Sequence, residues 1–323
     1  GGFITAITPS VQNDLGTLLT AGAATGNPNL TDSTGYTGTL DRETALNSIR
    51  FNGSGASAIV IPNGGLLRID SGGILQTGAV GGTTSISGGR LFGNVGSELI
   101  FTADSGTRTL SVSSAIGTSF ASATAILITK AGTGTLELSG FNSSTGAMSI
   151  QGGTVIASGG FAIGDTQSLN FPTLGDAMTF SLPSGTETVG NLSGGSSIAH
   201  GGSTVSIGAG AILTVNNASS TITFAGLLSG TGTFVKSGAG DLTLTGNSST
   251  SFTGPLIISQ GQLRLAGNDT TSGRIGSTAI TVANPGSQLH INQDNNNSPD
   301  RIVNTAVITL NNTAPGLGLF FRD

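Results

Sequence analysis

The segment Ile128-Thr-Lys-Ala-Gly-Thr-Gly-Thr-Leu-Glu-Leu-Ser-Gly140 occurs a second time, 106 residues later, as Phe234-Val-Lys-Ser-Gly-Ala-Gly-Asp-Leu-Thr-Leu-Thr-Gly246. Each copy has a lysine, three glycines and two leucines at the same places: Lys130, Gly132, Gly134, Leu136, Leu138 and Gly140 match Lys236, Gly238, Gly240, Leu242, Leu244 and Gly246. A repeated unit of short apolar runs predicts a solenoid, in which successive units stack to bury a common core.

The match continues beyond the two glycines that close these segments. Thr145-Gly146 corresponds to Thr253-Gly254 after a two-residue insertion, and we align residues 150–153 with residues 259–262. The repeat is therefore long enough to hold several strands and the turns between them.

Composition separates this chain from an ordinary globular enzyme. Of 323 residues, 8% are charged, 5% are aromatic, 54 are Gly, and neither Cys nor Trp occurs. Because 36% are hydrophobic, the chain has apolar side chains to bury and is expected to fold. The absence of Cys excludes disulfides and thiolate metal sites. The glycines have no three-residue period, which excludes a collagen helix.

Charge and hydropathy exclude two classes of partner. A net charge of −5 with two Lys residues does not suit a nucleic-acid surface, which needs clustered Lys and Arg. No apolar run approaches the roughly 20 residues of a membrane-spanning helix. The chain opens Gly-Gly-Phe without a basic and apolar leader, so we expect a segment of a longer protein.

From about residue 55 the sequence alternates short apolar couplets with Gly, Ser, Asn and Thr, which is typical of half-buried strands joined by turns. Examples are Ile59/Ile61, Leu67/Ile69, Leu110/Val112, Met148/Ile150, Val205/Ile207, Leu256/Ile258 and Leu289/Ile291. We assign residues 55–323 to one continuous solenoid. Residues 1–54 are less regular and are interpreted as an N-terminal cap or as rungs that carry insertions, with residues 41–51 as a strand rather than a helix.

The predicted fold is all-β, a right-handed parallel β-helix with about three short strands per rung. A rung of roughly 20–25 residues gives roughly a dozen rungs, and at about 4.8 Å per rung the rod is around 60 Å long. Glycine at the corners fits this geometry because it adopts left-handed conformations without steric cost.

The repeated motif Lys-x-Gly-x-Gly-x-Leu-x-Leu-x-Gly, followed by Gly261-Gln-Leu-Arg-Leu265, resembles the autotransporter-associated β-strand repeat. That family is found in the passenger regions of large bacterial surface proteins. One copy spans residues 226–291 and another spans 128–157. The resemblance implies a secreted β-solenoid in an extracellular or cell-surface location, and it says little about what the solenoid contacts.

Catalytic chemistry finds little support in the residues. Glycoside hydrolysis needs two facing carboxylates, yet the acids stand singly among Gly, Ser and Thr and are interpreted as solvated: Asp70, Glu98, Asp104, Glu137, Asp165, Asp176, Glu187 and Asp241. His200 and His290 are ninety residues apart and do not have zinc-ligand spacing. We therefore expect no enzyme activity and no cofactor.

Two sets of charged residues invite a closer look. Asp294 and Asp300 flank an Asn-rich loop and are the calcium candidates, although a polar loop is favoured over a metal site. Lys130 and Lys236 are expected to point outward from their strands, where a charge discourages lateral pairing.

The residues leave three functions open. The first is a structural stalk, fibre or adhesin segment of a bacterial surface protein. The second adds self-association, in which the open solenoid ends join chains into a filament, because residues 316–321 are apolar. The third is a glycan-binding or glycan-cleaving β-helix, which lacks Trp and has Tyr36 as its single Tyr.

Overall fold

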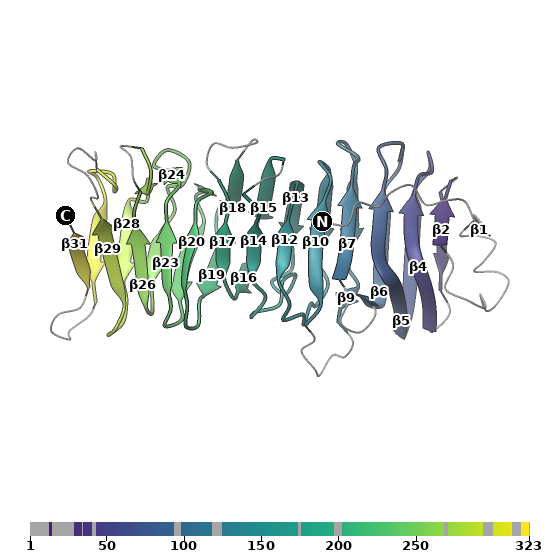
Figure 1. The fold of residues 1–323 in the computed structure, drawn as a ribbon, viewed down its shortest axis with the longest axis horizontal. Coiled ribbons are helices and arrows are strands. Elements are labelled where there is room, and N and C mark those ends of the chain that lie inside the picture. The colour runs from purple at the N-terminus through teal and green to yellow at the C-terminus, as the bar shows by residue number, and fades with distance from the viewer. Residues whose placement is uncertain are drawn as a thin grey trace.

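The structure is a computed structural model that describes residues 13–14, 29–33, 35–40, 43–93, 98–117, 125–173, 176–196, 202–267, 271–292, 300–311 and 318–322. These residues form strands and turns and include no helix. Among them there is therefore no helix long and apolar enough to span a membrane. The strands stack in parallel, rung upon rung, into an elongated coil (Figure 1). The predicted fold class, an all-β parallel β-helix, is confirmed.

Three ladders of parallel strands run along the coil, and the chain visits them in turn. The first ladder contains β1 (Asn13–Asp14), β2 (Asn29–Asp32), the end of β4 (Glu43–Phe51), the end of β5 (Ser57–Gln76), β7 (Glu98–Ala103), β10 (Leu127–Ala131), β12 (Met148–Ile150), β14 (Leu169–Phe171), β17 (Leu192–Gly194), β20 (Thr221–Phe224), β23 (Asp241–Leu244), β26 (Gln262–Leu265), β29 (Gln288–Asn292) and β31 (Leu319–Arg322).

The second ladder follows the first around the coil. It contains β3 (Thr37–Thr39), the start of β5, the start of β6 (Thr84–Gly93), β8 (Thr109–Val112), β11 (Thr135–Leu138), β13 (Gly153–Ala157), β15 (Met178–Leu182), β18 (Ser203–Ile207) and β21 (Leu227–Gly230). Beyond β21 this face carries the short pair β24 (Asn247–Ser248) and β27 (Arg274–Ile275).

The third ladder has two parts. The N-terminal part joins the start of β4, the middle of β5, the end of β6 and β9 (Ala115–Ile116). The C-terminal part joins β16 (Thr186–Val189), β19 (Ile212–Asn216), β22 (Thr233–Ser237), β25 (Leu256–Ile258), β28 (Ala279–Val282) and β30 (Val307–Leu310). Between β9 and β16 this face carries turns instead of named strands over residues 125–173, all of which the structure describes.

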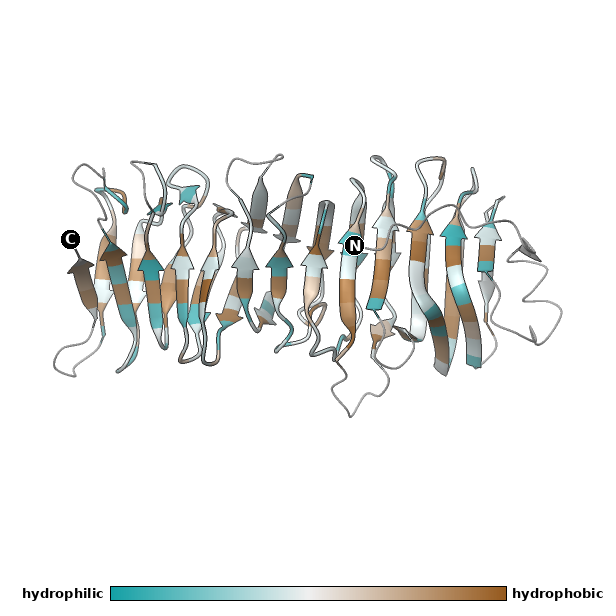
Figure 2. Ribbon diagram, in the orientation of Figure 1, coloured by the Kyte–Doolittle hydropathy of each residue, from teal (hydrophilic) through white to brown (hydrophobic). Residues whose placement is uncertain are grey.

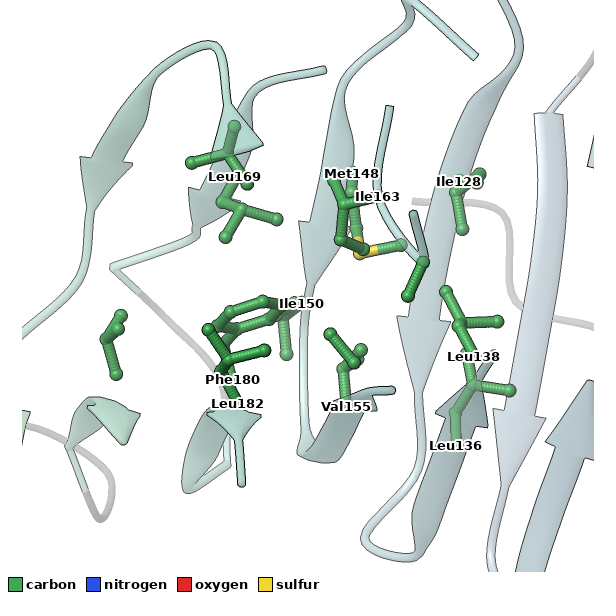
Figure 3. Packing of buried hydrophobic residues seen from close by; sticks show 14 of the residues in the cluster. Ile128, Leu136, Leu138, Met148, Ile150, Val155, Ile163, Leu169, Phe180 and Leu182 are labelled. Carbon is green, nitrogen blue, oxygen red and sulfur yellow. The ribbon is translucent and has the colours of Figure 1, made fainter. Parts of the chain in front are cut away.

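The alternating apolar couplets line one narrow interior, as the sequence pattern predicts. On β15 the inward residues Met178, Phe180 and Leu182 are buried while the residues between them are partly exposed. Figure 3 shows Leu138 and Met148 from neighbouring rungs directed into the same core. Each such buried side chain contributes about 1.5–3 kcal/mol, and stacking repeats this contribution at every rung. Brown segments accordingly recur from strand to strand in Figure 2.

Rung length varies more than the sequence suggests. In the first ladder the paired residues Ile128 and Met148 are 20 positions apart, whereas Leu289 and Leu319 are 30 apart. The predicted 20–25 residues therefore hold for some rungs and not for others, since Gly194 and Phe224 in the middle of the chain are also 30 apart.

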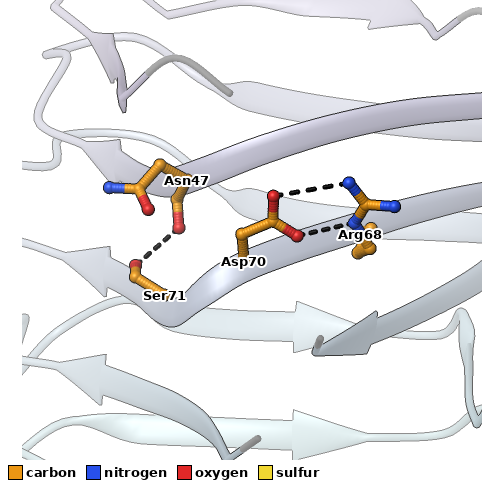
Figure 4. A network of polar contacts seen from close by, with 4 residues as sticks. All are labelled: Asn47, Arg68, Asp70 and Ser71. Atoms are coloured by element: carbon orange, nitrogen blue, oxygen red, sulfur yellow. Dashed lines mark hydrogen bonds and ion pairs between the residues drawn. The ribbon is translucent and has the colours of Figure 1, made fainter. Parts of the chain in front are cut away.

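The described part of residues 1–54 joins the same ladders. β4 confirms the predicted strand near residues 41–51, and it bends where its pairing with β5 shifts between Leu46 and Ser48. Figure 4 shows Ser71 donating a 2.5 Å hydrogen bond to the backbone carbonyl of Asn47 at this bend. On the outer side of β5, Arg68 pairs with Asp70. Because solvent screens such a surface pair, it adds little to stability, and the stacked interior dominates.

Candidate functional site

The repeated lysine is the first feature that the sequence singles out, and it is buried. Lys130 lies on β10 at an inward position, paired with Phe101 on one neighbouring rung and with Ile150 on the other. Its aliphatic stem therefore occupies the apolar interior, as long charged side chains often do. The expectation that this lysine points outward is wrong.

The ammonium of Lys130 reaches a corner of the coil. Its Nζ donates to the carbonyl oxygens of Ala131 and Gly132 at 2.7 Å each, and to that of Gly152 on the next rung at 3.0 Å. An ammonium has three donors, so all three have partners. We call this arrangement a lysine corner; it ties one rung to the next.

Lys236 makes a second lysine corner with almost the same distances. It lies on β22, and its Nζ donates to the carbonyls of Ser237 at 2.7 Å, Gly238 at 2.8 Å and Gln260 at 3.0 Å. Lys236 is also fully buried, so the outward interpretation is wrong here too. The repeated lysine is thus an internal clamp on the backbone.

Burial changes the acidity of both lysines. Desolvation lowers the pKa of Lys130 to about 8, against which the negative charge of Asp104 acts weakly. Desolvation likewise lowers the pKa of Lys236 to about 8, opposed by Asp241. Because 8 lies above neutral pH, both amines carry a proton at pH 7 and donate three charge-assisted hydrogen bonds.

The lysine corners explain why the two copies of the repeat have glycines at the same spacing. Gly132 and Gly238 have φ angles of +77° and +76°, which favour glycine. Gly153 and Gly261 have φ angles of +65° and +64° and face the corner from the next rung. A Cβ on Gly153 would lie 2.6 Å from the carbonyl oxygen of Gly132.

The structure also corrects our alignment of the two copies. Lys130 pairs with Ile150 and Lys236 pairs with Ile258, so Ile150 is equivalent to Ile258 and not to Ser259. The downstream alignment is therefore shifted by one residue. The remaining motif residues fall at corresponding places: Leu136 and Leu138 are buried on β11, Leu242 and Leu244 are buried on β23, and Gly134, Gly140, Gly240 and Gly246 lie in turns packed against the preceding rung.

The two copies occupy different faces of the coil. The strand with Lys130 belongs to the first ladder, whereas the strand with Lys236 belongs to the third. The next strand of each copy is shifted in the same sense, since β11 lies in the second ladder and β23 in the first. A lysine corner is therefore a local device that works at more than one corner of the solenoid.

Glu187 differs from the solvated surface acid that the sequence suggests. It is buried on β16, where its Oε1 accepts the backbone N–H of Ile163 at 3.1 Å and its Oε2 that of Ala162 at 3.2 Å. Desolvation raises the pKa of Glu187 to about 7, while these two hydrogen bonds lower it and the charge of Asp165 raises it further. The carboxylate therefore serves the backbone.

Asn142 works with Glu187 across the break in the third ladder. Its Oδ1 accepts the N–H of Ile116 at 2.8 Å, and its Nδ2 donates to the carbonyl of Ala162. The backbone N–H of Asn142 donates to Phe161 at 2.8 Å. Side chains thus replace the missing strand pairing and keep the buried backbone groups satisfied.

Two exposed phenylalanines lie over this break, and we did not expect them from the sequence. Phe141 and Phe161 are 50% and 55% exposed, and their ring centroids are 5.2 Å apart. They line a hollow of about 240 Å³ together with Asn142, Ser143, Ser144, Thr145, Gly164, Asp165 and Thr166. We call it the phenylalanine hollow. The signal was present, because each ring directly follows a glycine and the two lie 20 residues apart, one rung in this region.

The remaining candidates fall at scattered places. Among the described residues, no three His, Asp or Glu side chains come together as a metal-binding group. Asp294 and His200 lie outside the described residues, and His290 stacks on Phe320 with centroids 4.6 Å apart. Asp300 is exposed, and its backbone carbonyl accepts a hydrogen bond from Arg274.

Comparison with known proteins gives two findings. The family described as Passenger-associated-transport-repeat matches residues 128–157 and 234–265, which contain both lysine corners. The Adhesin BmaC autotransporter of Brucella suis biovar 1 (strain 1330) is 30% identical over 271 residues, which is 80% of this chain and 8% of that protein. The chain therefore spans a small part of this relative. No solved structure matches it.

Proposed function

The chain is a β-solenoid of the autotransporter-passenger type that carries two passenger-associated transport repeats, and from this premise we propose that it is a non-enzymatic structural segment of a bacterial surface protein. In this proposal the segment lies outside the cell and serves as a stalk, fibre or adhesin segment. Its work is mechanical: it holds its length and presents its outer face.

The lysine corners are the observation that carries this proposal. Lys130 and Lys236 each join carbonyls of two successive rungs, so a rung cannot separate from its neighbour without breaking a buried, charge-assisted hydrogen bond. The strand ladders add backbone hydrogen bonds in the same direction, along the axis. Residues that the chain repeats most faithfully are thus used to hold rungs together.

The buried acids support the same interpretation. Glu187 accepts two backbone N–H groups, and Asp32 accepts those of Gly35 at 2.8 Å and Tyr36 at 3.1 Å. A catalytic carboxylate must be free to contact a substrate. These carboxylates are instead committed to turns of the solenoid.

Single-molecule pulling on the two ends of the chain tests the mechanical function. Rungs of 20–30 residues should be released in steps of about 70–100 Å, at 3.3–3.6 Å per residue. Smooth extension at low force, without discrete steps, would contradict this mechanical function. A reducing-sugar assay on a panel of polysaccharides tests the non-enzymatic part of the proposal. Steady release of reducing sugar ends by the chain would contradict it.

We further propose that the last described rung is a stacking surface, which joins chains end to end where no further rung of the same chain covers it. Leu310 and Phe321 occupy inward positions but are 49% and 70% exposed. Their partners one rung earlier, Val282 and Ile291, are buried. An open rung of this kind offers unpaired backbone and apolar side chains to a second chain.

Sedimentation over a range of concentrations tests this stacking. The unaltered chain should form concentration-dependent oligomers, and the double variant Leu310→Lys, Phe321→Lys should remain monomeric. Val307→Lys is the matched control, because Val307 is 66% exposed on the same strand and pairs with the exposed Ala279. A chain that stays monomeric at every concentration would overturn the proposal.

A further inference from the structure

We propose that the phenylalanine hollow is a binding site for one neutral sugar ring. The proposal stands apart from the stalk function, because a solenoid that binds nothing here would still bear load. It begins with an unusual exposure: most aromatic side chains that the structure describes are buried, including Phe101, Phe180 and Phe234, whereas Phe141 and Phe161 share one outer surface. Exposed apolar side chains grouped in this way mark interaction sites.

The floor of the hollow holds the two rings in place. Asn142 directly follows Phe141 in the chain and holds the backbone that carries the second ring. Its N–H donates to the carbonyl of Phe161 and its Nδ2 donates to the carbonyl of Ala162. Glu187 binds the N–H groups of Ala162 and Ile163 from the other side. The platform is therefore formed before any ligand arrives, which lowers the entropic cost of binding.

The rim of the hollow gives the chemistry of the ligand. Ser143, Thr145 and Thr166 contribute hydroxyl groups, and Asp165 contributes an exposed carboxylate. Its lining residues, all within the described range 125–173, include neither Lys nor Arg, so a phosphate or a carboxylate would meet only negative charge. A ligand that fits must have an apolar face for the rings and hydroxyl donors at its edge.

A pyranose ring has this arrangement. Its C–H face can lie against the phenyl rings while its hydroxyls donate to the Asp165 carboxylate and share hydrogen bonds with the rim. The hollow, at about 240 Å³, is smaller than the sites of drug-sized ligands, which begin at about 300 Å³, so it suits a single ring. An extended peptide would need a longer groove.

Saturation-transfer NMR with the intact chain tests this site. The probes are the methyl pyranosides of glucose, galactose, mannose and N-acetylglucosamine at millimolar concentration. We expect saturation of the ring C–H protons of at least one probe, with a dissociation constant in the millimolar range. The double variant Phe141→Ala, Phe161→Ala should weaken binding at least tenfold, and Asp165→Asn should weaken it severalfold. These side chains are exposed, so the variants should fold.

Leu127→Ala is the matched control, because Leu127 is an exposed apolar residue elsewhere on the coil and its loss should leave binding unchanged. Equal binding by the double phenylalanine variant would overturn the proposal, as would the absence of saturation with every probe. Binding of a lysine-rich peptide to the hollow, in the absence of saturation with any sugar, would also overturn it, because a basic side chain would then be the ligand. Pulling behaviour unchanged in the double variant separates failure of this site from failure of the stalk function.

Discussion

Lys130 and Lys236 form the same clamp on two different faces of the solenoid. Each ammonium donates to two carbonyls at the end of its own strand and to one carbonyl of the next rung. The positive charge of the ammonium thus lies among three carbonyl oxygens, which carry partial negative charge. Because the contacts are local, a repeat can be placed at either corner without altering the ladders.

Replacing a clamp lysine with methionine should destabilise the chain. Lys130→Met keeps the apolar stem but leaves the carbonyls of Ala131, Gly132 and Gly152 without their donor. An unsatisfied buried polar group costs about 1–3 kcal/mol. We expect the free energy of unfolding in urea to fall by about 2–4 kcal/mol, and by a similar amount for Lys236→Met.

Arg108→Met is the control for that experiment, since Arg108 is exposed and should change stability by less than about 0.5 kcal/mol. Clamp variants as stable as the control would show that the ammonium contributes nothing to the stacking of rungs.

The clamps should also make stability depend on alkaline pH. In the folded chain both lysines titrate near pH 8, whereas an unfolded lysine titrates at 10.5. Between these values the unfolded chain binds more protons, so the free energy of unfolding should rise with pH across the window. The expected rise is on the order of 1 kcal/mol per lysine. Urea unfolding at pH 7.5 to 10.5 measures it, and Lys236→Met should reduce the slope; a slope identical in the variant would contradict the assignment.

Glu187 should produce the opposite trend at acid pH. Its pKa is about 7 in the folded chain and 4.5 in the unfolded chain, so the folded chain binds more protons between these values. The stabilisation is complete below pH 4.5 and is lost as the pH rises through 7. Thermal unfolding from pH 4.5 to 7.5 should show the decline in the unaltered chain and a flatter profile in Glu187→Gln. An equally steep decline in that variant would assign the titration to another group.

Glycines that face a lysine corner should tolerate no side chain. A Cβ on Gly261 would lie 2.5 Å from the carbonyl oxygen of Gly238 at a φ of +64°. Gly210 has a φ of +75° but open space around it, so Gly210→Ala measures the conformational cost alone, about 1–2 kcal/mol. Gly261→Ala should lose clearly more in urea unfolding. Equal losses would mean that the corner is loose enough to admit a methyl group.

The solenoid could be predicted from the sequence, but the inward direction of its two lysine side chains could not. Alternation of apolar residues predicts the ladders, because each strand needs only two inward side chains. The same alternation places Lys130 in phase with Ile128, and Lys236 in phase with Phe234, on the inward face. We nevertheless expected both lysines in solvent, since the carbonyls that receive them are invisible in a sequence.

Features that depend on two or more rungs could not be predicted in the same way. Glu187 resembles other isolated acids in the chain until its backbone partners at Ala162 and Ile163 are known. The break in the third ladder, and with it the placement of Phe141 beside Phe161, depends on how three rungs align. Pairing between rungs, rather than local preference, decides these positions.

Disulfide formation between engineered cysteines tests the stacked register most directly, because the chain has no native Cys. Thr179 and Thr204 are 25 residues apart and directly paired on β15 and β18, whereas Thr204 and Thr214 are ten residues apart but lie on different faces. Strand neighbours fall within the Cα separation of about 4.4–6.8 Å that a disulfide allows. The account predicts near-complete oxidation of Thr179→Cys/Thr204→Cys and little of Thr204→Cys/Thr214→Cys. The reverse result, in which Thr204→Cys/Thr214→Cys forms the disulfide and Thr179→Cys/Thr204→Cys does not, would contradict the solenoid.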